Sequence, residues 1–288
     1  MVKKAIIPIA GLGTRFLPLS KAVPKELLPL ADKPIIQYLI EEARDSGIEE
    51  IIFVLNPNNK KMAEYLKPSL KLEKILKERK KTDILEEVKE LEDLFRGLTF
   101  SFVIQKEPLG DGHAILQAAK LVKDEPVACM FGDDIIDSDT PGIAQLEKVF
   151  RTCEKPIIGL YKPPKETLPS YGVIKNEKIA NRLHKVKGIV EKPKADKLPS
   201  DLAIVGKYIL TPEVFHYLKR VKPSGKGEII LAEAFNLMLK EGKLIYAYEF
   251  DGEWFECGDK AKWLKSNLHF SLNHPKYGPE LRRFVKKI

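Results

Sequence analysis

One stretch near the N-terminus limits what this chain can fold into more than any other. Residues 6–29 read IIPIAGLGTRFLPLSKAVPKELLP. The apolar run Ala5–Ala10 has the length and composition of a buried parallel strand, and it ends at Gly11-Leu12-Gly13, where the backbone can turn sharply and approach a ligand. Two cations, Arg15 and Lys25, follow this loop. The pattern predicts a polyphosphate site in which backbone amides and positive side chains meet the phosphate oxygens.

The glycine loop does not fit the two best-known phosphate-binding motifs. The dinucleotide-binding fingerprint needs a third glycine where Phe16 stands, and the Walker motif closes on Gly-Lys-Ser/Thr, which is not found here. By themselves, the glycines are equally compatible with a tight strand exit that binds nothing. Arg15 and Lys25 favour a ligand, but the stretch alone indicates only that the ligand is a polyphosphate.

Composition narrows the class of protein. A chain of 288 residues can bury one large α/β core or two modest domains. No apolar run is long enough to span a bilayer, and Ala5–Ala10 is too short for the core of a secretory signal, so we expect no membrane partner. The three cysteines are scattered without a C-x-x-C pair, which indicates neither a disulfide framework nor a zinc site and favours a cytoplasmic protein.

The formal charge of +8 is compatible with nucleic-acid binding, with a phosphorylated small substrate or with a lysine-rich surface. Basic and acidic residues are interspersed through stretches such as Lys71–Glu92, and no basic stripe with aromatic residues occurs. We therefore expect a solvated surface and no nucleic-acid partner.

Hydrophobic periodicity predicts alternating strands and helices along the chain. Strands are predicted at 5–10, 50–55, 99–105, 127–131, 156–161, 171–175, 188–190, 202–209 and 244–250. Helices are predicted at 33–46, 114–122, 140–152, 211–220, 229–241 and 260–272, with two or three more between 60 and 96. This order indicates an α/β fold with a Rossmann-like, mostly parallel mixed sheet flanked by helices and a smaller β region. Because no linker or repeat is evident, we expect a single domain over 1–288.

Polar residues follow three other predicted strands, where ligands of open α/β sheets bind. Gln105 ends one strand, Asp133 and Asp134 follow a second, and Glu191-Lys192 follows a third. The side-chain amide of Gln105 can meet one face of a uracil, but it does not exclude thymine. Paired carboxylates suit Mg²⁺, which is commonly bound by one or two carboxylates together with phosphate oxygens. The alternative interpretation is an ordinary polar strand end, a capped turn and a surface turn, respectively.

The opening stretch as a whole, G-x-G-T-R-x-x-P followed by P-K-x-x-x-P, resembles the signature of the sugar-nucleotide pyrophosphorylases. The residues in register with it are Gly11, Gly13, Thr14, Arg15, Pro18, Pro24, Lys25 and Pro29. The segment Q-x-x-P-L-G-x-G-H-A, which begins at Gln105, is similar to that of bacterial UTP–glucose-1-phosphate uridylyltransferases, although Asp111 stands where that family usually has an apolar residue. Further matches follow in the family's order, at Tyr171-Gly172-Val173, Glu191-Lys192-Pro193, Val205–Tyr208 and Gly225–Ala232.

The resemblance implies a fold, a reaction and an assembly. The fold would be that of the GT-A-like nucleotidyltransferases, with a nucleotide-binding half at about 1–150, a sugar-phosphate-binding half at about 151–270 and a basic tail at 271–288. The enzyme would use Mg²⁺ to make UDP-glucose and pyrophosphate from UTP and glucose 1-phosphate. A homodimer or a homotetramer would be its assembly.

The resemblance also implies roles for individual residues. Arg15 and Lys25 would hold the triphosphate and the departing pyrophosphate, and Lys192 the sugar phosphate. The nucleotide would be bound by Ala10, Gly11, Gly13, Thr14, Glu26, Gln105, Gly110 and Asp134. The sugar would be bound by Gly172, Glu191, Gly206 and Glu228. The metal would be bound by Asp133 and Glu256.

Glu256 is the chief departure from the family, which usually has aspartate at this position. The longer carboxylate can reach the ion directly or through water, and Asp259 is an alternative partner for Asp133. Two other functions stay open: a related pyrophosphorylase that uses dTTP, CTP or another sugar 1-phosphate, and a regulatory homologue that binds sugar nucleotides without turnover. Glu256 invites the second alternative, and the retention of Lys25 and Lys192 argues against it.

Overall fold

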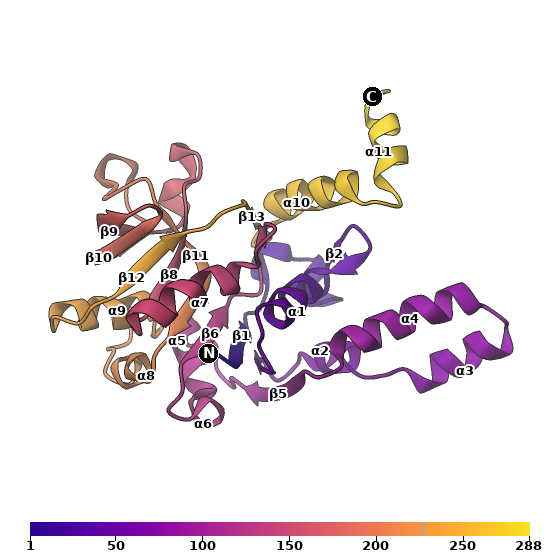
Figure 1. Ribbon diagram of the computed structural model, residues 1–288, viewed down its shortest axis with the longest axis horizontal. Coiled ribbons are helices and arrows are strands. Elements are labelled where there is room, and N and C mark those ends of the chain that lie inside the picture. Colours follow the sequence, from indigo (N-terminus) through magenta and orange to yellow (C-terminus); the bar gives the residue numbers. More distant parts are fainter. Residues whose placement is uncertain (226) are drawn as a thin grey trace.

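A computed structural model describes residues 1–225 and 227–288, so that Lys226, inside the Gly225–Ala232 segment, lies outside the described residues. Within the described part, nine strands form one sheet in the order β5-β4-β1-β6-β11-β8-β12-β10-β9 (Figure 1). These strands are β1 (Lys4–Ile9), β4 (Glu50–Leu55), β5 (Thr99–Ile104), β6 (Val127–Met130), β8 (Ile157–Tyr161), β9 (Gly172–Ala180), β10 (Leu183–Glu191), β11 (Ala203–Leu210) and β12 (Tyr246–Glu249).

The sheet is parallel on one side and mixed on the other. Strands β5, β4, β1 and β6 run parallel, whereas β11 is antiparallel to both β6 and β8. Beyond β8, β12 is parallel to it, and β10 pairs antiparallel with both β12 and β9. This confirms the expected α/β fold with a mostly parallel mixed sheet. It also means that the loops after β1, β5 and β6 leave the same edge of the sheet.

Helices cover both faces of this sheet. The helices of the described residues are α1 (Ile35–Asp45), α2 (Lys60–Tyr65), α3 (Leu70–Glu78), α4 (Thr82–Phe95), α5 (Asp111–Gln117), α6 (Ala119–Val122), α7 (Gly142–Cys153), α8 (Pro212–Leu218), α9 (Leu231–Lys240), α10 (Lys260–Asn273) and α11 (Gly278–Val285). Helices α1 and α7 pack on one face, and α5, α8 and α9 on the other. In Figure 1, α3 and α4 project from the body as a pair, and α10 and α11 carry the chain away to the C-terminus.

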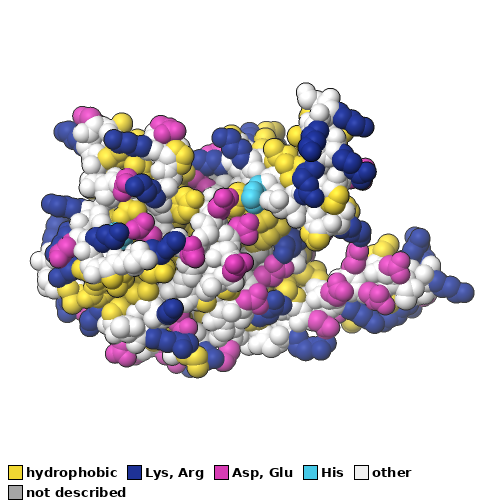
Figure 2. All heavy atoms as spheres, turned by 45° about the horizontal axis from the view of Figure 1, so that its top comes forward, with side chains coloured by type: hydrophobic (Ala, Val, Ile, Leu, Met, Phe, Trp, Pro, Cys, Tyr) yellow, Lys and Arg dark blue, Asp and Glu magenta, His cyan; other side chains and the backbone are white. Residues whose placement is uncertain are grey.

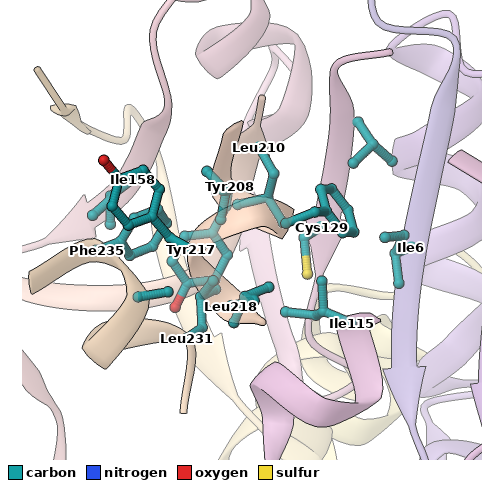
Figure 3. Close-up of a cluster of buried hydrophobic side chains, with 14 of the residues drawn as sticks. Ile6, Ile115, Cys129, Ile158, Tyr208, Leu210, Tyr217, Leu218, Leu231 and Phe235 are labelled. Carbon is teal, nitrogen blue, oxygen red and sulfur yellow. The ribbon is translucent and has the colours of Figure 1, made fainter. Parts of the chain in front are cut away.

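Alternating side chains of β1 explain how one short strand serves two cores. Ala5, Ile7 and Ile9 point into the core under α1 and α7, whereas Ile6 points into the opposite core. Figure 3 shows this second core, in which residues of the sheet meet residues of α5, α8 and α9. Its labelled members are Ile6, Ile115, Cys129, Ile158, Tyr208, Leu210, Tyr217, Leu218, Leu231 and Phe235. Burial on both faces fixes β1 and, with it, the start of the glycine loop.

Most predicted elements agree with the structure in place and type, and the differences are local. The helix predicted at 114–122 begins earlier, at Asp111, and is divided into α5 and α6. Strands β9 and β10 form a longer hairpin than the two short segments predicted. Two short strands, β7 (Asp134–Asp137) and β13 (Glu253–Glu256), were not predicted, and they pair with each other outside the main sheet. Neither were β2 (Pro29–Leu30) and β3 (Lys33–Pro34), which form a second small pair.

Charged side chains of both signs share the surface. Figure 2 shows Lys and Arg interspersed with Asp and Glu over this face of the molecule, including the projecting α3 and α4 pair. Among the described residues, no helix combines the length and the apolar character needed to cross a membrane.

Candidate active site

A cavity of about 1030 Å³ lies beyond the carboxyl ends of β1 and β6. Its walls contain every residue that the sequence assigned to the site except Gly13 and Thr14. Those lining it are Ala10, Gly11, Arg15, Lys25, Glu26, Gln105, Gly110, Asp133, Asp134, Gly172, Glu191, Lys192, Gly206, Glu228 and Glu256. Residues from distant parts of the chain therefore share one hollow, at the sheet edge where α/β proteins bind ligands.

Gly13 and Thr14 lie in the loop that leads to Arg15, outside the cavity lining. Gly13 has a φ of 62°, which favours glycine, and its carbonyl accepts a hydrogen bond of 2.9 Å from the amide of Phe16. Thr14 begins the short 3₁₀ helix η1 (Thr14–Phe16) and is exposed. The fully buried Phe16 anchors this turn, so that Arg15 is held at the cavity.

Lys25 and Asp133 form an ion pair in the wall of the cavity. Lys25 Nζ donates to Asp133 Oδ2 over 2.6 Å. Burial alone would raise the pKa of Asp133, but the charges of Lys25 and Arg15 outweigh burial and lower it. For Lys25, burial acts to lower the pKa, and Asp133 and Glu26 more than offset this effect. Both groups are therefore held in their charged forms, ready to meet phosphate or a cation.

Asp133 and Glu256 converge on one point beside Gly258. A Cβ atom placed on Gly258 would lie 2.8 Å from Glu256 Oε1, 3.0 Å from Asp133 Oδ2 and 3.3 Å from Arg15 Nη1. The absence of a side chain at Gly258 thus makes room for these polar atoms. The pairing of β7 with β13 accounts for their approach, because Glu256 stands opposite Asp134 in that ladder.

This pair of carboxylates fits the chemistry of a hard divalent cation. Within 1–225 and 227–288, no group of three or more His, Cys, Asp or Glu side chains forms a complete metal site. Magnesium does not require one, since it is commonly bound through one or two carboxylates together with substrate phosphates and water. Asp133 and Glu256 supply that number of carboxylates, next to the two cations that suit a phosphate chain.

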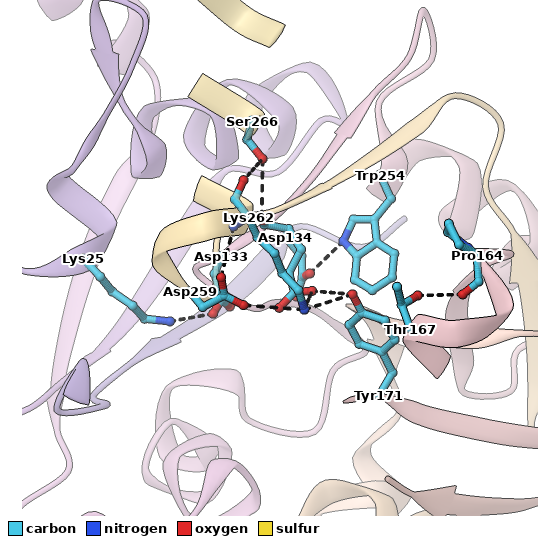
Figure 4. A network of polar contacts seen from close by, with 11 residues as sticks. Lys25, Asp133, Asp134, Pro164, Thr167, Tyr171, Trp254, Asp259, Lys262 and Ser266 are labelled. Atoms are coloured by element: carbon cyan, nitrogen blue, oxygen red, sulfur yellow. Dashed lines mark hydrogen bonds and ion pairs between the residues drawn. The ribbon is translucent and has the colours of Figure 1, made fainter. Parts of the chain in front are cut away.

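Two neighbours engage the second oxygen of Glu256 (Figure 4). Oε2 accepts hydrogen bonds from the Tyr171 hydroxyl over 2.6 Å and from Lys262 Nζ over 2.5 Å. Lys262 Nζ also donates to the Tyr171 hydroxyl over 3.0 Å. Asp259, the alternative partner for Asp133, instead caps α10 by accepting from the amide of Lys262. Asp259 does not line the cavity, whereas Glu256 does and lies with Asp133 beside Gly258.

Two further buried carboxyl groups line the cavity. Burial raises the pKa of Glu26 to about 7, against the opposing effect of Lys25, and no hydrogen bond reaches its Oε1 within the described residues. Burial, together with Asp133 and Glu256, also raises the pKa of Asp134 to about 7. Asp134 accepts a hydrogen bond of 2.8 Å from Trp254 Nε1, which acts to lower its pKa and only partly offsets these effects.

Gln105, in the cavity wall, lies against Gly110 and His113. The amide nitrogen of Gln105 donates to the Gly110 carbonyl over 3.0 Å and lies 2.9 Å from His113 Nδ1. With its nitrogen so engaged, Gln105 offers a ligand its carbonyl oxygen, which suits an N–H donor such as N3 of uracil.

The loop after β5 packs tightly against the segment that carries Glu228. A Cβ atom on Gly110, whose φ is 97°, would lie 2.5 Å from the Ile229 carbonyl oxygen and 3.1 Å from Glu228 Cβ. Asp111 secures the same contact, because its carboxylate accepts hydrogen bonds from the amides of Gly112 and Leu231. The departure from an apolar residue at Asp111 therefore has a structural role.

Glu191 and Lys192 line the wall contributed by the hairpin of β9 and β10. Gly172 stands opposite Glu191 in the ladder, and a Cβ on Gly172 would lie 3.0 Å from Glu191 Oε2. Lys192 adopts a φ of 48° and is tied to the Tyr171 carbonyl through its amide, over 3.0 Å. A carboxylate and an ammonium group thus both line this wall, and together they can bind hydroxyl groups and an anion.

Gly206 allows β11 to pass close under the carboxylates. A Cβ on Gly206 would lie 2.3 Å from Asp134 Oδ2 and 2.6 Å from Phe131 Cβ. The neighbouring Lys207 is fully buried and pairs with Glu42 of α1 over 2.7 Å.

Sequence reasoning missed the residues that surround Glu256. Trp254 shares a face of β13 with Glu256, but this four-residue strand was itself not predicted, so the alternation of its side chains was not available as a signal. Lys262 follows three residues after the helix-capping Asp259, but nothing in the local pattern indicates that it contacts Glu256. Tyr171 was noted only as part of a motif, and its hydroxyl contact depends on the tertiary fold.

Comparison with known proteins gives consistent results. The family model described as "Nucleotidyl transferase" matches residues 4–271. UTP–glucose-1-phosphate uridylyltransferase of Staphylococcus haemolyticus is 43% identical over 287 residues, which cover 100% of this chain and 98% of that protein.

Solved structures extend the similarity. A UTP-bound UDP-glucose pyrophosphorylase of Acinetobacter baumannii superposes with a TM-score of 0.92 at 33% identity, over 100% of both chains. A UDP-glucose pyrophosphorylase complexed with UDP-glucose gives a TM-score of 0.84 at 35% identity, over 94% of this chain and 98% of the other.

Proposed function

The chain belongs to the nucleotidyl transferase family, and on that premise we propose that it is a UTP–glucose-1-phosphate uridylyltransferase. The reaction joins UTP and glucose 1-phosphate to give UDP-glucose and pyrophosphate. Both substrates are phosphorylated, and the observation that carries the proposal is that Arg15, Lys25 and Lys192 line one cavity together with Asp133 and Glu256.

The chemistry is an in-line displacement at phosphorus. An oxygen of the sugar phosphate attacks the α-phosphorus of UTP, the bond from that phosphorus to the bridging oxygen of the β-phosphate breaks, and pyrophosphate leaves with the electron pair. Because the attacking oxygen already carries negative charge, no general base is needed. Catalysis then consists of positioning and charge stabilisation.

Each cation has a separate task in this proposal. Arg15 and Lys25 hold the triphosphate and offset the charge that develops on the departing pyrophosphate. Lys192 brings the anionic sugar phosphate toward the α-phosphorus, and Glu191 accepts hydrogen bonds from sugar hydroxyls. Glu228 and the backbone at Gly172 and Gly206 complete the sugar wall.

We propose that the base occupies the end of the cavity at Gln105 and Gly110. The Gln105 carbonyl oxygen faces the N3–H of uracil, and the backbone at Ala10 and Gly11 lies along the ring, near the buried Glu26. These contacts alone do not discriminate against thymine, so the choice of base depends on the fit of the whole cavity.

Magnesium is the proposed cofactor, held by Asp133 and Glu256. When bound, it would neutralise and orient the phosphate oxygens. The two carboxylates come from the proposed nucleotide half (1–150) and the proposed sugar half (151–270), with the tail 271–288 outside both. Asp134, the residue after Asp133, accepts a hydrogen bond from Trp254 Nε1.

Assembly and location are also proposals. Exposed apolar residues on α10 and α11, including Leu264, Leu268 and Phe284, support a homodimer or homotetramer, which light scattering would test. A cytoplasmic location is supported by Cys129, Cys153 and Cys257, which form no disulfide in the described chain.

The test of the function is pyrophosphate release by the purified chain with Mg²⁺. UTP, dTTP and CTP are each combined with glucose 1-phosphate and other hexose 1-phosphates, and UTP with glucose 1-phosphate should give the highest kcat/KM. A higher value for another pair would identify a related pyrophosphorylase. Calorimetric binding of UDP-glucose without turnover would identify a non-catalytic homologue.

A further inference from the structure

We propose that Lys262 is a positioning residue of the metal site, which holds one oxygen of Glu256, together with Tyr171, so that the other oxygen faces Asp133. The inference rests on the proposed function, because it concerns the carboxylate pair assigned there to Mg²⁺. Lys262 does not itself line the cavity, and it acts through Glu256.

The two oxygens of Glu256 have different surroundings. Oε2 accepts from Lys262 Nζ over 2.5 Å and from the Tyr171 hydroxyl over 2.6 Å. Oε1 lies on the other side, within 2.8 Å of the Cβ position on Gly258 that is 3.0 Å from Asp133 Oδ2. One oxygen is therefore anchored to protein, and the other is presented to the place where the carboxylates converge.

The length of Glu256 explains why it needs this anchor. A glutamate has one more rotatable bond than an aspartate, so more side-chain freedom must be lost when its carboxylate is fixed in one place. Ligating carboxylates are commonly oriented by hydrogen bonds from outer residues, and removal of those partners weakens metal affinity by roughly 10- to 100-fold. Lys262 and Tyr171 are such partners for Glu256.

Lys262 is itself held in place from several sides. It lies in the first turn of α10, where its ammonium is 3.8 Å from Asp259 Oδ2 and 4.7 Å from the centre of the Tyr171 ring. The Tyr171 ring in turn lies 4.8 Å from the Trp254 ring. Figure 4 shows Lys262, Tyr171 and Trp254 approaching one another from separate elements. The contact to Glu256 is thus part of a fixed arrangement.

The ammonium also offsets charge. Asp133, Asp134 and Glu256 bring three carboxyl groups together, and Lys25 pairs with the first of them. Lys262 provides the corresponding cation for Glu256. The ion pair is made to Oε2 of Glu256, so that Oε1 stays available to the metal.

The test compares Lys262→Met with the wild type and with Lys265→Met. Methionine keeps the apolar stem and removes the charge, and Lys265 is an exposed lysine of the same helix. In Lys262→Met only, two quantities should rise about 10-fold. The first is the free Mg²⁺ concentration for half-maximal rate, and the second is the Kd for Mn²⁺ measured by calorimetry on the metal-free protein. The KM for glucose 1-phosphate and the Tm should stay near the wild-type values, and Lys262→Arg should restore much of the metal affinity.

A double variant separates positioning from a general structural effect. In Lys262→Met combined with Glu256→Gln, the metal dependence should equal that of Glu256→Gln alone, because Lys262 acts only through that side chain. Additive effects, or a Lys262→Met protein with unchanged Mg²⁺ and Mn²⁺ values, overturn the inference. If the wild-type protein releases no pyrophosphate, the proposed function itself is overturned. The wild-type assay shows this before any variant is compared.

Discussion

Lys25 Nζ lies 2.6 Å from Asp133 Oδ2, although 108 positions separate the two residues in the chain. The contact joins the loop after β1 to the loop after β6, the two neighbouring strands whose ends bound the cavity. In the proposed reaction, Lys25 meets the triphosphate and Asp133 meets the metal. In that proposal the incoming nucleotide would meet two groups that already hold each other in their charged forms.

Asp133→Asn should lower the Mg²⁺-dependent rate of pyrophosphate release by at least about 100-fold. The amide keeps the shape of the side chain but loses the charge that the metal and Lys25 require. Rates at saturating UTP and glucose 1-phosphate, across a range of Mg²⁺ concentrations, provide the measurement. Asp139→Asn, at an exposed position nearby, is the control. An Asn variant that keeps most of the activity would refute Asp133 as a metal ligand.

Lys192→Ala should lower kcat by about 100-fold or more while the Kd for UTP changes little, because the proposed function assigns Lys192 to the sugar phosphate and not to the nucleotide. Steady-state kinetics with saturating glucose 1-phosphate and calorimetric titration with UTP test the two halves of this prediction. Lys194→Ala, two residues away and exposed, should behave like the wild type. Near-normal turnover in Lys192→Ala would remove Lys192 from the mechanism.

Asp111→Asn should change how stability depends on pH. Burial raises the pKa of Asp111 to about 6. The folded protein therefore keeps a proton on Asp111 between about pH 4 and 6 that the unfolded chain releases, and stability falls as pH rises through this window. At about 1.4 kcal/mol per pKa unit, this group costs about 3 kcal/mol above pH 6. Asparagine keeps the acceptor oxygen and removes that cost.

Urea unfolding at pH 4.5, 5.5 and 7 measures this effect. The free energy of unfolding of Asp111→Asn, relative to the wild type, should increase across the series, whereas the difference for the exposed Asp139→Asn should stay flat. The assignment fails if the Asp111→Asn difference is independent of pH.

Gly110→Ala should destabilise the protein more than Gly97→Ala. Both glycines have positive φ, 97° and 85° respectively, and no atom lies within 4 Å of a Cβ on Gly97. Gly97→Ala therefore reports backbone strain alone, roughly 1–2 kcal/mol. A Cβ on Gly110 adds a 2.5 Å contact with the Ile229 carbonyl oxygen, so the total should be about 3 kcal/mol or more. Equal losses in thermal unfolding would show that the two loops are not packed as described.

Local patterns were sufficient to predict β1, the glycine loop and most of the sheet. The run Glu50–Leu55 is almost continuously apolar because its side chains enter the cores on both faces of the sheet, and such a run is recognisable without tertiary information. The outer part of the β9–β10 hairpin was underestimated because it is polar. Cross-strand contacts such as Lys187 with Glu177, 2.6 Å apart, accompany its backbone pairing.

The candidate site was predictable where a motif carries it and not where the tertiary fold does. Motif positions such as Arg15, Lys25 and Lys192 line the cavity as expected. The pairing of β7 with β13 was not predicted, because four-residue strands separated by more than a hundred positions leave no periodic signal. The contact of Lys262 with Glu256 depends on that pairing and on the start of α10, so the sequence alone gave no indication of it.

The β7–β13 ladder has a consequence for how this family can vary. It fixes the backbone of residue 256 opposite residue 134, so any change in side-chain length at 256 must be absorbed by neighbouring side chains and not by movement of the strand. Residues 171 and 262 are the neighbours that absorb it here. The three positions should therefore vary together among homologues. We expect homologues with glutamate at 256 to have a hydrogen-bond donor at 262, and homologues with aspartate at 256 to show no preferred residue type at 262.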